Sequence, residues 1–210
     1  MNLNQLREDY KQNSLSETEV PKEPFELFRN WFEQAMKSQI KDVNAMTLAT
    51  AGLDGRPSAR TVLLKEIAHG GFVFFTNYQS KKSQELLSNP HAALLFFWND
   101  LERQIRIEGS VEKINVAESE TYFNSRPELS KAGAIVSPQS QKIPNRLFLE
   151  EKLKTLLDSN SELRMPNHWG GFCLIPSYIE FWQGRPGRLH DRIVYEKIDA
   201  QSWSIFRLAP

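Results

Sequence analysis

The chain has 210 residues, of which 40% are hydrophobic and 25% are charged, a composition typical of a globular protein with a core of its own. Lysine and arginine together number 26, as do the acidic residues, so the sequence lacks the basic excess expected of a general nucleic-acid-binding protein. The single cysteine, Cys173, excludes an intrachain disulfide and a multi-cysteine metal site.

The sequence also predicts where the protein works. Residues 1–10 are polar and lack the apolar core of a signal peptide, and no apolar run approaches the roughly 20 residues that span a membrane. A lone cysteine suits a reducing compartment. His69, His91 and His168 have no second ligand at zinc spacing, so no metal site is expected. We expect a soluble cytoplasmic protein with neither a membrane nor a nucleic-acid partner.

The N-terminal part of the chain predicts an arm followed by a helix. Residues 1–22 are polar and weakly patterned, which predicts a flexible arm, and residues 23–210 are expected to form a single domain. Pro24 is a favourable first-turn residue, and apolar residues recur at helical spacing from Phe25 to Met36.

The next segments alternate between strand and turn patterns. Residues 45–51 and 58–67 flank Asp54-Gly55, a pair that tolerates the positive φ of a hairpin turn, so an antiparallel pair of strands is predicted. Residues 72–77 predict a third strand, and residues 81–88 predict a short helix.

The rest of the chain predicts further strands with helices between them. The remaining predicted strands cover residues 92–98, 103–114, 170–182, 188–198 and 203–208, and the remaining predicted helices cover 116–124 and 146–157. Many antiparallel strands joined by hairpins, with a few helices, favour a mainly β member of the α+β class. We expect a small antiparallel β-barrel with helices packed on its outside.

Two basic segments in the first half of the chain have the charge to bind anions. In RTVLLK, residues 60–65, a strand places Arg60 and Lys65 on opposite faces, and the alternative is that both are solvated strand-end charges. Lys81 and Lys82 open the predicted helix over 81–88, where free backbone N–H groups favour anions. This junction lacks the GxxxxGK[ST] pattern of nucleotide-hydrolase loops, and a capped surface helix is its alternative interpretation.

A third basic cluster follows residues 116–124. Tyr122 and Arg126 are four residues apart and share a helix face if the helix reaches Arg126. With Ser130 they would supply two hydroxyls and a guanidinium to an oxyanion. The alternative is a helix C-terminus with an arginine that complements the helix dipole.

The segment FWQGRPGRLHDR, residues 181–192, carries the most functional information. Arg188, His190 and Arg192 alternate after a Gly/Pro-rich turn, so an extended chain would point all three the same way, toward an anionic, planar ligand. Trp182 offers a stacking surface, although it also suits a barrel core. Asp191 is the alternative partner for one of the arginines.

Taken in order, six motifs resemble the pyridoxine/pyridoxamine 5′-phosphate oxidase family. They are RTVLLK (60–65), FFTNYQSKK (74–82), LERQIRIEG (101–109), YFNSRP (122–127), WGGF (169–172) and IEFWQGRPGRLHDR (179–192). The resemblance runs over nearly the whole chain, from residues 6–10 to 206–210.

The resemblance implies an FMN-binding split β-barrel that forms a homodimer with FMN between the subunits. It implies oxidation of pyridoxine 5′-phosphate or pyridoxamine 5′-phosphate to pyridoxal 5′-phosphate, by hydride transfer from C4′ to FMN. Dioxygen would then reoxidise the flavin and give hydrogen peroxide. Two phosphate sites, one for FMN and one for the B6 vitamer, would account for separate basic clusters in a chain of zero net charge.

The resemblance also implies which residues form the site. The implied FMN contacts are Arg60, Thr61, Val62, Leu63, Leu64, Lys65, Phe75, Thr76, Lys81, Lys82, Gln104, Gln139, Ser140, Trp182 and Arg192. The implied vitamer contacts are Lys65, Tyr122, Arg126 and Ser130 at its phosphate, Arg188, Leu189 and His190 at its ring, and Arg7, Glu8, Asp9 and Tyr10 as a lid. Arg188 and His190 are the implied catalytic pair, with His190 acting either as a proton acceptor or only in binding. Lys81 departs from the arginine common in the family, which keeps the charge but loses bidentate geometry.

Three other functions compete with this one. They are a split-barrel flavoprotein with another substrate, a non-catalytic carrier of FMN or pyridoxal phosphate, and a nucleic-acid-binding barrel, which the zero net charge disfavours. Neither of the first two functions requires all of the implied vitamer contacts, so the presence of those residues together favours the oxidase.

Overall fold

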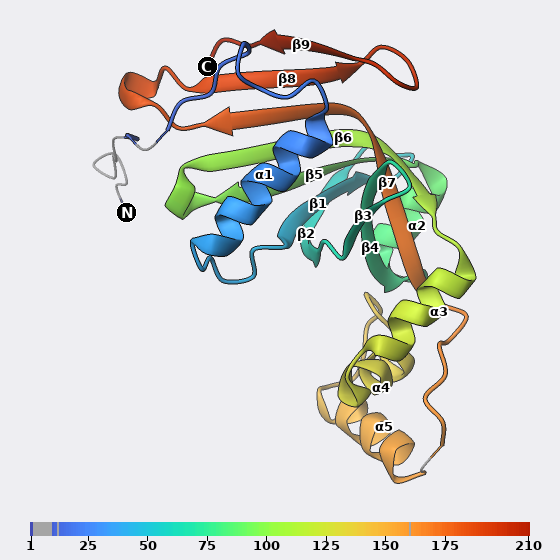
Figure 1. Ribbon diagram of the computed structural model, residues 1–210. Coiled ribbons are helices and arrows are strands. Elements are labelled where there is room, and N and C mark those ends of the chain that lie inside the picture. The colour runs from blue at the N-terminus through green and yellow to red at the C-terminus, as the bar shows by residue number, and fades with distance from the viewer. Residues whose placement is uncertain (2–9, 12, 160) are drawn as a thin grey trace.

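The computed structural model describes residues 1, 10–11, 13–159 and 161–210 (Figure 1). Arg7, Glu8 and Asp9, expected in the lid, lie outside the described residues. Nine strands form one antiparallel sheet within the described ranges: β1 (Ala45–Ala51), β2 (Pro57–Leu63), β3 (Glu66–Ala68), β4 (Gly71–Asn77), β5 (His91–Trp98), β6 (Arg103–Lys113), β7 (Trp169–Gln183), β8 (Asp191–Lys197) and β9 (Trp203–Arg207).

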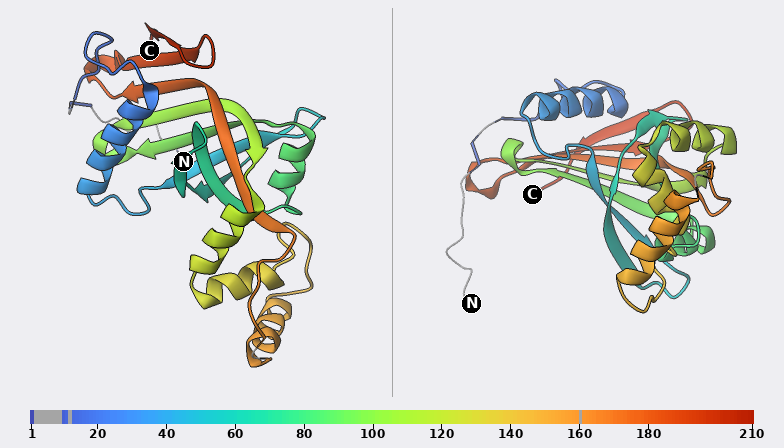
Figure 2. Two further views of the ribbon diagram at one scale, coloured as in Figure 1. Left: turned by 45° about the vertical axis from the view of Figure 1, so that its right-hand side comes forward. Right: turned by 90° about the horizontal axis from the view of Figure 1, so that it is seen from below.

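Five α-helices and two short 3₁₀ turns complete the described chain. They are α1 (Pro24–Lys37), α2 (Lys81–Ser88), η1 (Asn99–Leu101), α3 (Val116–Ser125), α4 (Glu128–Val136), α5 (Leu147–Asp158) and η2 (Pro186–Arg188). None of the helices in the described ranges is long and apolar enough to cross a membrane. Figure 2 shows α1 lying over the sheet, while α3, α4 and α5 gather at one end of the molecule.

The long, bent strand β7 makes the sheet curl and divide. Its first half pairs with β4, where Phe74 lies opposite Phe172, and its second half pairs with β8, where Trp182 lies opposite Arg192. Both halves pair with β6 on the other side, across a register shift at Glu108/Gly109 that bends the ladder. The strand order is therefore β2-β1-β5-β6-β7-β4-β3, with β8 and β9 extending from β7.

Strand β2, at one end of this order, and β4, next to the other end, approach each other without pairing along their length. The backbone N–H of Lys65 donates to Val73 O at 2.9 Å, which ties the end of β2 to β4. In the described chain no strand ladder joins β2 to β4 beyond this point. The result is a barrel with an opening between β2 and β4, which confirms the predicted antiparallel barrel with helices outside.

Helix α1 closes one side of the barrel because its apolar residues fall on one face. Phe28 is fully buried and packs edge-on against Phe72 and Phe96, with ring centroids 5.0 and 5.3 Å apart. Trp31, on the same face, packs edge-on against Phe181 of β7. These contacts join α1 to strands from both halves of the sheet, so the core is continuous.

Three elements differ from the sequence predictions. The strand predicted over 58–67 divides into β2 and β3, because Leu64 and Lys65 direct their backbone N–H groups to Asn44 O and Val73 O. The strand predicted over 188–198 begins only at Asp191, because Arg188 lies in η2 with φ 61°. Helix α4 was not predicted, because its sequence ELSKAGAIV contains glycine and serine and buries only Ala132 among its described residues.

Part of the predicted arm packs on the C-terminal strands. The backbone N–H of Leu15 donates to Asp191 Oδ2 at 3.0 Å, and Arg207 Nη2 donates to Leu15 O at 2.9 Å. The hydroxyl of Tyr195 donates to Pro21 O at 2.7 Å. The arm is therefore held against β8 and β9 from Leu15 to Pro21.

Candidate active site

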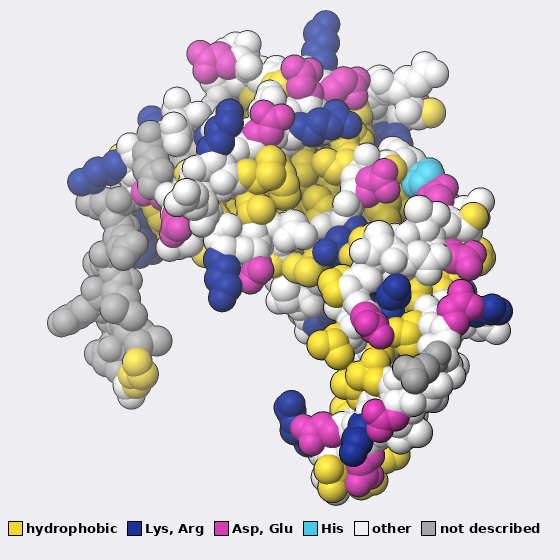
Figure 3. All heavy atoms as spheres, turned by 60° about the horizontal axis from the view of Figure 1, so that its bottom comes forward, with side chains coloured by type: hydrophobic (Ala, Val, Ile, Leu, Met, Phe, Trp, Pro, Cys, Tyr) yellow, Lys and Arg dark blue, Asp and Glu magenta, His cyan; other side chains and the backbone are white. Residues whose placement is uncertain are grey.

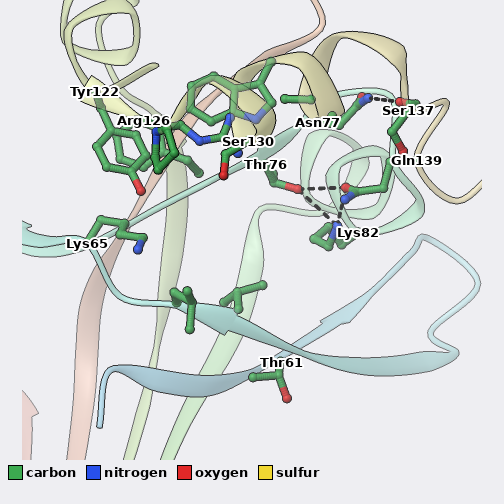
Figure 4. A pocket seen from close by; sticks show the side chains of 17 residues that line it. Thr61, Lys65, Thr76, Asn77, Lys82, Tyr122, Arg126, Ser130, Ser137 and Gln139 are labelled. Carbon is green, nitrogen blue, oxygen red and sulfur yellow. Dashed lines mark hydrogen bonds between the residues drawn. The ribbon is translucent and has the colours of Figure 1, made fainter. Parts of the chain in front are cut away.

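A pocket of about 650 Å³ lies at the opening between β2 and β4, under α3 and α4 (Figure 4). It is lined by Thr61, Val62, Leu63, Lys65, Phe75, Thr76, Asn77, Lys82, Tyr122, Arg126, Pro127, Ser130, Gly133, Ala134, Ser137, Gln139 and Trp169. The structure thus brings together residues of three predicted basic clusters, which are far apart in the sequence. Residues of β2 and β4 and of the helices α3 and α4 give the pocket both polar and apolar walls.

Lys82 forms one end of the pocket. Its Nζ donates to Gln139 Oε1 at 2.8 Å, Thr76 Oγ1 at 3.1 Å and Ser80 Oγ at 3.2 Å. No carboxylate in the described chain pairs with it. Burial, and then the charge of Arg60, lowers the pKa of Lys82 to about 8. An ammonium that is desolvated and held by neutral acceptors is a site for an anion.

Behind Lys82, the half-buried carboxylate of Glu85 fixes two more cations. Glu85 Oε2 accepts from Thr50 Oγ1 at 2.6 Å and lies 3.4 Å from Arg60 Nη2, while Oε1 accepts from Lys81 Nζ at 2.5 Å. Burial alone would raise the pKa of Glu85, but hydrogen bonds from Lys81, Ser58 and Thr50 lower it to about 2. Arg60 and Lys81 lie beside the Lys82 end but do not line the pocket.

Arg126 forms the other end. Its Nη1 is buried and makes no hydrogen bond to the described residues, and burial lowers its pKa. Helix α3 ends at Ser125 and Arg126 follows it with extended backbone, so the condition for Tyr122 and Arg126 to share a helix face is not met. Figure 4 shows Tyr122, Arg126 and Ser130 together, with Lys65 pointing toward them.

Three stacked aromatic rings form the wall at this end; we call Phe75, Tyr122 and Trp169 the aromatic triad. Phe75 stacks on Tyr122 with centroids 4.0 Å apart and on Trp169 with centroids 5.4 Å apart. Lys65 Nζ lies 5.9 Å from the Tyr122 centroid, and the Arg126 guanidinium lies 4.9 Å from the Trp169 ring. Trp169 was not among the predicted site residues, although its WGGF motif carried part of the family resemblance.

The predicted functional segment 181–192 does not reach this pocket within one chain. His190 packs against Trp182 at 4.7 Å and Tyr10 at 5.5 Å. Arg188 lies in the turn η2, whereas Arg192 on β8 donates to both carboxylate oxygens of Glu180 at 2.8 and 3.0 Å. The prediction that Arg188, His190 and Arg192 alternate on one strand is therefore wrong, because the strand starts after His190.

We call Gln104, Trp182, Arg188, His190 and Arg192 the second cluster. One ring nitrogen of its histidine, His190, already accepts a hydrogen bond. The backbone N–H of Arg185 donates to His190 Nδ1 at 3.1 Å. Burial, followed by the charge of Arg188, lowers the pKa of His190, against a smaller opposing effect of Asp191. The neutral ring therefore carries its hydrogen on Nε2 and presents a donor there.

The remaining predicted residues are dispersed. Leu64 is buried in the core, Leu189 is exposed, and Gln104 lies on β6 opposite Trp182. Ser140 follows Gln139 and has a φ of 70°. Pocket residues that the sequence did not predict are Asn77, Pro127, Gly133, Ala134, Ser137 and Trp169.

Comparisons with known proteins agree over nearly the whole chain. The family model described as pyridoxamine 5′-phosphate oxidase matches residues 32–159, and that of the pyridoxine 5′-phosphate oxidase C-terminal dimerisation region matches residues 169–210. Pyridoxine/pyridoxamine 5′-phosphate oxidases of Trichormus variabilis and Polynucleobacter asymbioticus are 54% and 55% identical to this chain. Both matches cover 98% of this chain, and they cover 97% and 98% of the respective relatives.

Solved structures share this fold. PhzG from Burkholderia lata, determined in complex with tetrahydrophenazine-1-carboxylic acid, superposes with a TM-score of 0.89 at 30% identity, over 95% of this chain and 99% of that one. A pyridoxamine 5′-phosphate oxidase-related, FMN-binding protein of Nostoc punctiforme shares the fold, with a TM-score of 0.72 at 17% identity over 91% of this chain and 100% of that one. The chain belongs to the pyridoxine/pyridoxamine 5′-phosphate oxidase family, and it carries that family's C-terminal dimerisation region.

Proposed function

We propose that this protein oxidises pyridoxine 5′-phosphate or pyridoxamine 5′-phosphate to pyridoxal 5′-phosphate and uses FMN as its cofactor. One observation carries the proposal: a single pocket has two cationic ends, at Lys82 and Arg126, and neither cation is neutralised by a carboxylate of the described chain. A phosphorylated cofactor beside a phosphorylated substrate needs such a pair of ends.

The Lys82 end suits the FMN phosphate. Lys82 and the Thr76 hydroxyl can both donate to phosphate oxygens, and Gln139 can exchange its acceptor for its amide donor. Arg60 and Lys81, fixed by Glu85, add positive charge behind them. When bound, FMN would supply the redox chemistry as the acceptor of a hydride from C4′, with dioxygen taking the electrons to give hydrogen peroxide. With pyridoxamine 5′-phosphate the product of oxidation is an imine, which water would hydrolyse to the aldehyde with release of ammonia.

The Arg126 end suits the substrate phosphate. Arg126 offers a free guanidinium edge, Ser130 and Tyr122 offer hydroxyls, and Lys65 completes the charge. A phosphate dianion can accept from all four groups, and charge-assisted bonds of this kind are strong. Binding the phosphate here positions the rest of the substrate along the pocket, and such positioning lowers the barrier by restricting the approach of the reacting atoms.

The second cluster is proposed to complete the site of the partner subunit. Gln104, Trp182 and Arg192 lie on neighbouring strands, and Arg188 and His190 lie in the adjoining turn. Residues 169–210 match a dimerisation region, and exposed hydrophobic side chains remain at Phe97, Val116, Leu129 and Leu147. Figure 3 shows hydrophobic side chains along the projection formed by α3, α4 and α5, which is a surface that a second copy would cover.

In that arrangement Tyr10, packed on His190 and Trp182, would lie at the entrance to the partner's pocket. Arg188 would hold the substrate ring and stabilise charge on it. His190 would donate from Nε2, because its Nδ1 already accepts from Arg185.

The test is the flavin spectrum of the purified protein under anaerobic conditions. We expect a yellow protein whose flavin bleaches when pyridoxine 5′-phosphate is added and recovers when air is admitted, with release of pyridoxal 5′-phosphate. Unphosphorylated pyridoxine at the same concentration is the control and should bleach it far more slowly. A colourless protein that cannot be loaded with FMN would refute the proposal.

A further inference from the structure

Arg126 is held by aromatic rings where other arginines of this chain are held by acids. Its guanidinium lies 4.9 Å from the Trp169 ring and 5.7 Å from the Phe123 ring. By contrast, Arg60, Arg192 and Arg207 each pair with a carboxylate at 3.4 Å or less. No such pair forms at Arg126 in the described part of the chain, and its Nη1 is buried without an acceptor.

Arg103 shows what the same support does elsewhere in this chain. Its guanidinium lies 4.4 Å from the Trp31 ring, but its Nε and Nη1 donate to Gln183 Oε1 and Gln34 Oε1 at 2.8 and 2.7 Å. Arg103 is thus a structural cation whose donors are occupied. Arg126 has the aromatic support without those acceptors, and it lines a pocket.

The indole of Trp169 is itself tightly fixed. Trp169 is 6% exposed at the start of β7, and its backbone pairs with Asn77 and donates to Pro166 O at 2.9 Å. Its ring stacks on Phe75 with a 12° interplanar angle and meets Phe123 edge-on at 5.1 Å. The ring cannot turn without displacing both neighbours, so its face defines a fixed place for a cation.

The quadrupole of an aromatic ring attracts a guanidinium to the ring face. The ring is a poor hydrogen-bond acceptor, so the N–H groups at the edge of the guanidinium stay free. A carboxylate in its place would neutralise the charge and occupy two N–H groups, which a substrate phosphate would then have to displace. The rings therefore orient the cation and leave its donors available.

We propose that Trp169 is a positioning residue. Its indole face holds the Arg126 guanidinium without neutralising its charge, so that its N–H groups are oriented to donate to a phosphate. This inference rests on the proposed function, because it assigns the substrate phosphate to the Arg126 end. It predicts that Trp169 acts on the phosphate group of the substrate, through Arg126, and leaves FMN binding alone.

The test compares Trp169→Leu and Trp169→Phe in the FMN-loaded enzyme. Binding of pyridoxal 5′-phosphate and of unphosphorylated pyridoxal is measured for each by titration. We expect Trp169→Leu to weaken the affinity for pyridoxal 5′-phosphate at least about tenfold and to change the affinity for pyridoxal less than about twofold. Trp169→Phe keeps a ring face and should retain most of the affinity for pyridoxal 5′-phosphate. In steady-state kinetics KM for pyridoxine 5′-phosphate should rise more than kcat falls.

The coupling between the two residues is measured in an Arg126→Met background. If Trp169 acts through Arg126, adding Trp169→Leu to Arg126→Met should cause little further loss of pyridoxal 5′-phosphate affinity. Trp203→Leu is the matched control, because Trp203 also lies against a cation, Lys197 at 5.7 Å, on strands away from the pocket. It should leave both affinities unchanged.

Equal weakening of pyridoxal and pyridoxal 5′-phosphate, or a full additional loss in the Arg126→Met background, would overturn the inference and leave Trp169 a purely structural residue. Failure of the proposed function looks different, because the wild-type protein would then bind neither FMN nor pyridoxal 5′-phosphate.

Discussion

Lys82 and Gln139 are 57 residues apart in the sequence, yet Lys82 Nζ donates to Gln139 Oε1 at 2.8 Å. The acceptor is an amide, so it satisfies the ammonium without cancelling its charge. This pair therefore leaves the pocket with a net positive end that a phosphate can neutralise. The charge of Lys82 should then be visible in the pH dependence of phosphate binding.

FMN binding should weaken as pH rises above about 8. The pKa of Lys82 is lowered to about 8 in the ligand-free protein, so the ammonium is lost above that pH, whereas a bound phosphate stabilises it and raises the pKa. FMN titrations between pH 7 and about 9.5, where the phosphate is already a dianion, should give a dissociation constant that rises up to about tenfold per pH unit.

The Lys82→Met variant is the control for this pH dependence. It should bind FMN more weakly at pH 7 and should lose the rise above pH 8, because the ammonium whose deprotonation causes that rise is absent. A wild-type profile that stays flat to pH 9.5 would show that Lys82 does not hold the phosphate.

Glu85 should stabilise the fold only at pH values where it is ionised. Its pKa is lowered from 4.5 to about 2, so its contribution is fully present above pH 4.5 and is lost as pH falls toward 2. Glu85→Gln should lower the free energy of unfolding by about 1 kcal/mol at pH 7, measured by urea denaturation, because the interactions with Arg60 and Lys81 weaken. The difference from wild type should shrink between pH 4.5 and 2, and an undiminished difference there would contradict the assignment.

Local patterns were sufficient to predict most of the fold. The alternation of Ile105 and Ile107 with polar neighbours, and the Asp54-Gly55 turn, are local signals, and β6 and the β1–β2 hairpin form at these positions, although the strand predicted over 58–67 ends early. Helix α4 was missed because it is short, contains glycine and serine, and fully buries only Ala132 among its described residues.

The site was harder to predict, because its assembly depends on long-range geometry. The spacing of Arg188, His190 and Arg192 suggested a common strand face, but a left-handed residue at Arg188 delays the strand to Asp191. No local pattern indicates that Trp169 meets Arg126, since the two are brought together by the packing of α3 on the start of β7, where Phe123 meets Trp169 and Ser119 accepts from the backbone N–H of Gly171. The family resemblance predicted most of the pocket residues, and the structure added Trp169 and five others that were not among the predicted site residues.

Arg188→Leu should abolish most turnover without loss of FMN. Arg188 already has a φ of 61°, and leucine at that position carries a similar backbone strain, so the exchange tests the guanidinium rather than the turn. Loss of one charge-stabilising donor typically costs about 100-fold or more in kcat. Pyridoxal 5′-phosphate formation measures turnover, and the flavin spectrum measures FMN; Arg164→Leu, at an exposed arginine paired with Glu162, is the control.

The same variant tests whether two subunits build one site. Heterodimers that combine an Arg188→Leu chain with an Arg126→Met chain should regain activity, because one of their two sites would contain both native residues. Mixtures that stay as inactive as either variant, despite verified subunit exchange, would argue that Arg188 and Arg126 serve the same subunit's site.

His190 should act by donating a hydrogen bond, and not as a base. Its Nδ1 accepts from the backbone N–H of Arg185 at 3.1 Å, and its pKa is lowered, so at neutral pH the ring is uncharged with its hydrogen on Nε2. Such a ring would face the substrate with a donor.

Two substitutions separate these roles for His190. His190→Gln can present an amide N–H where Nε2–H stood, so kcat/KM should fall less than about tenfold, whereas His190→Ala removes the donor and should lose about 100-fold. If His190 instead accepted a proton from the substrate, glutamine would be as poor a substitute as alanine, because an amide is not a base at neutral pH. Equal losses in the two variants would therefore reverse the assignment, and comparison of the two kcat/KM values at a single pH suffices to decide it.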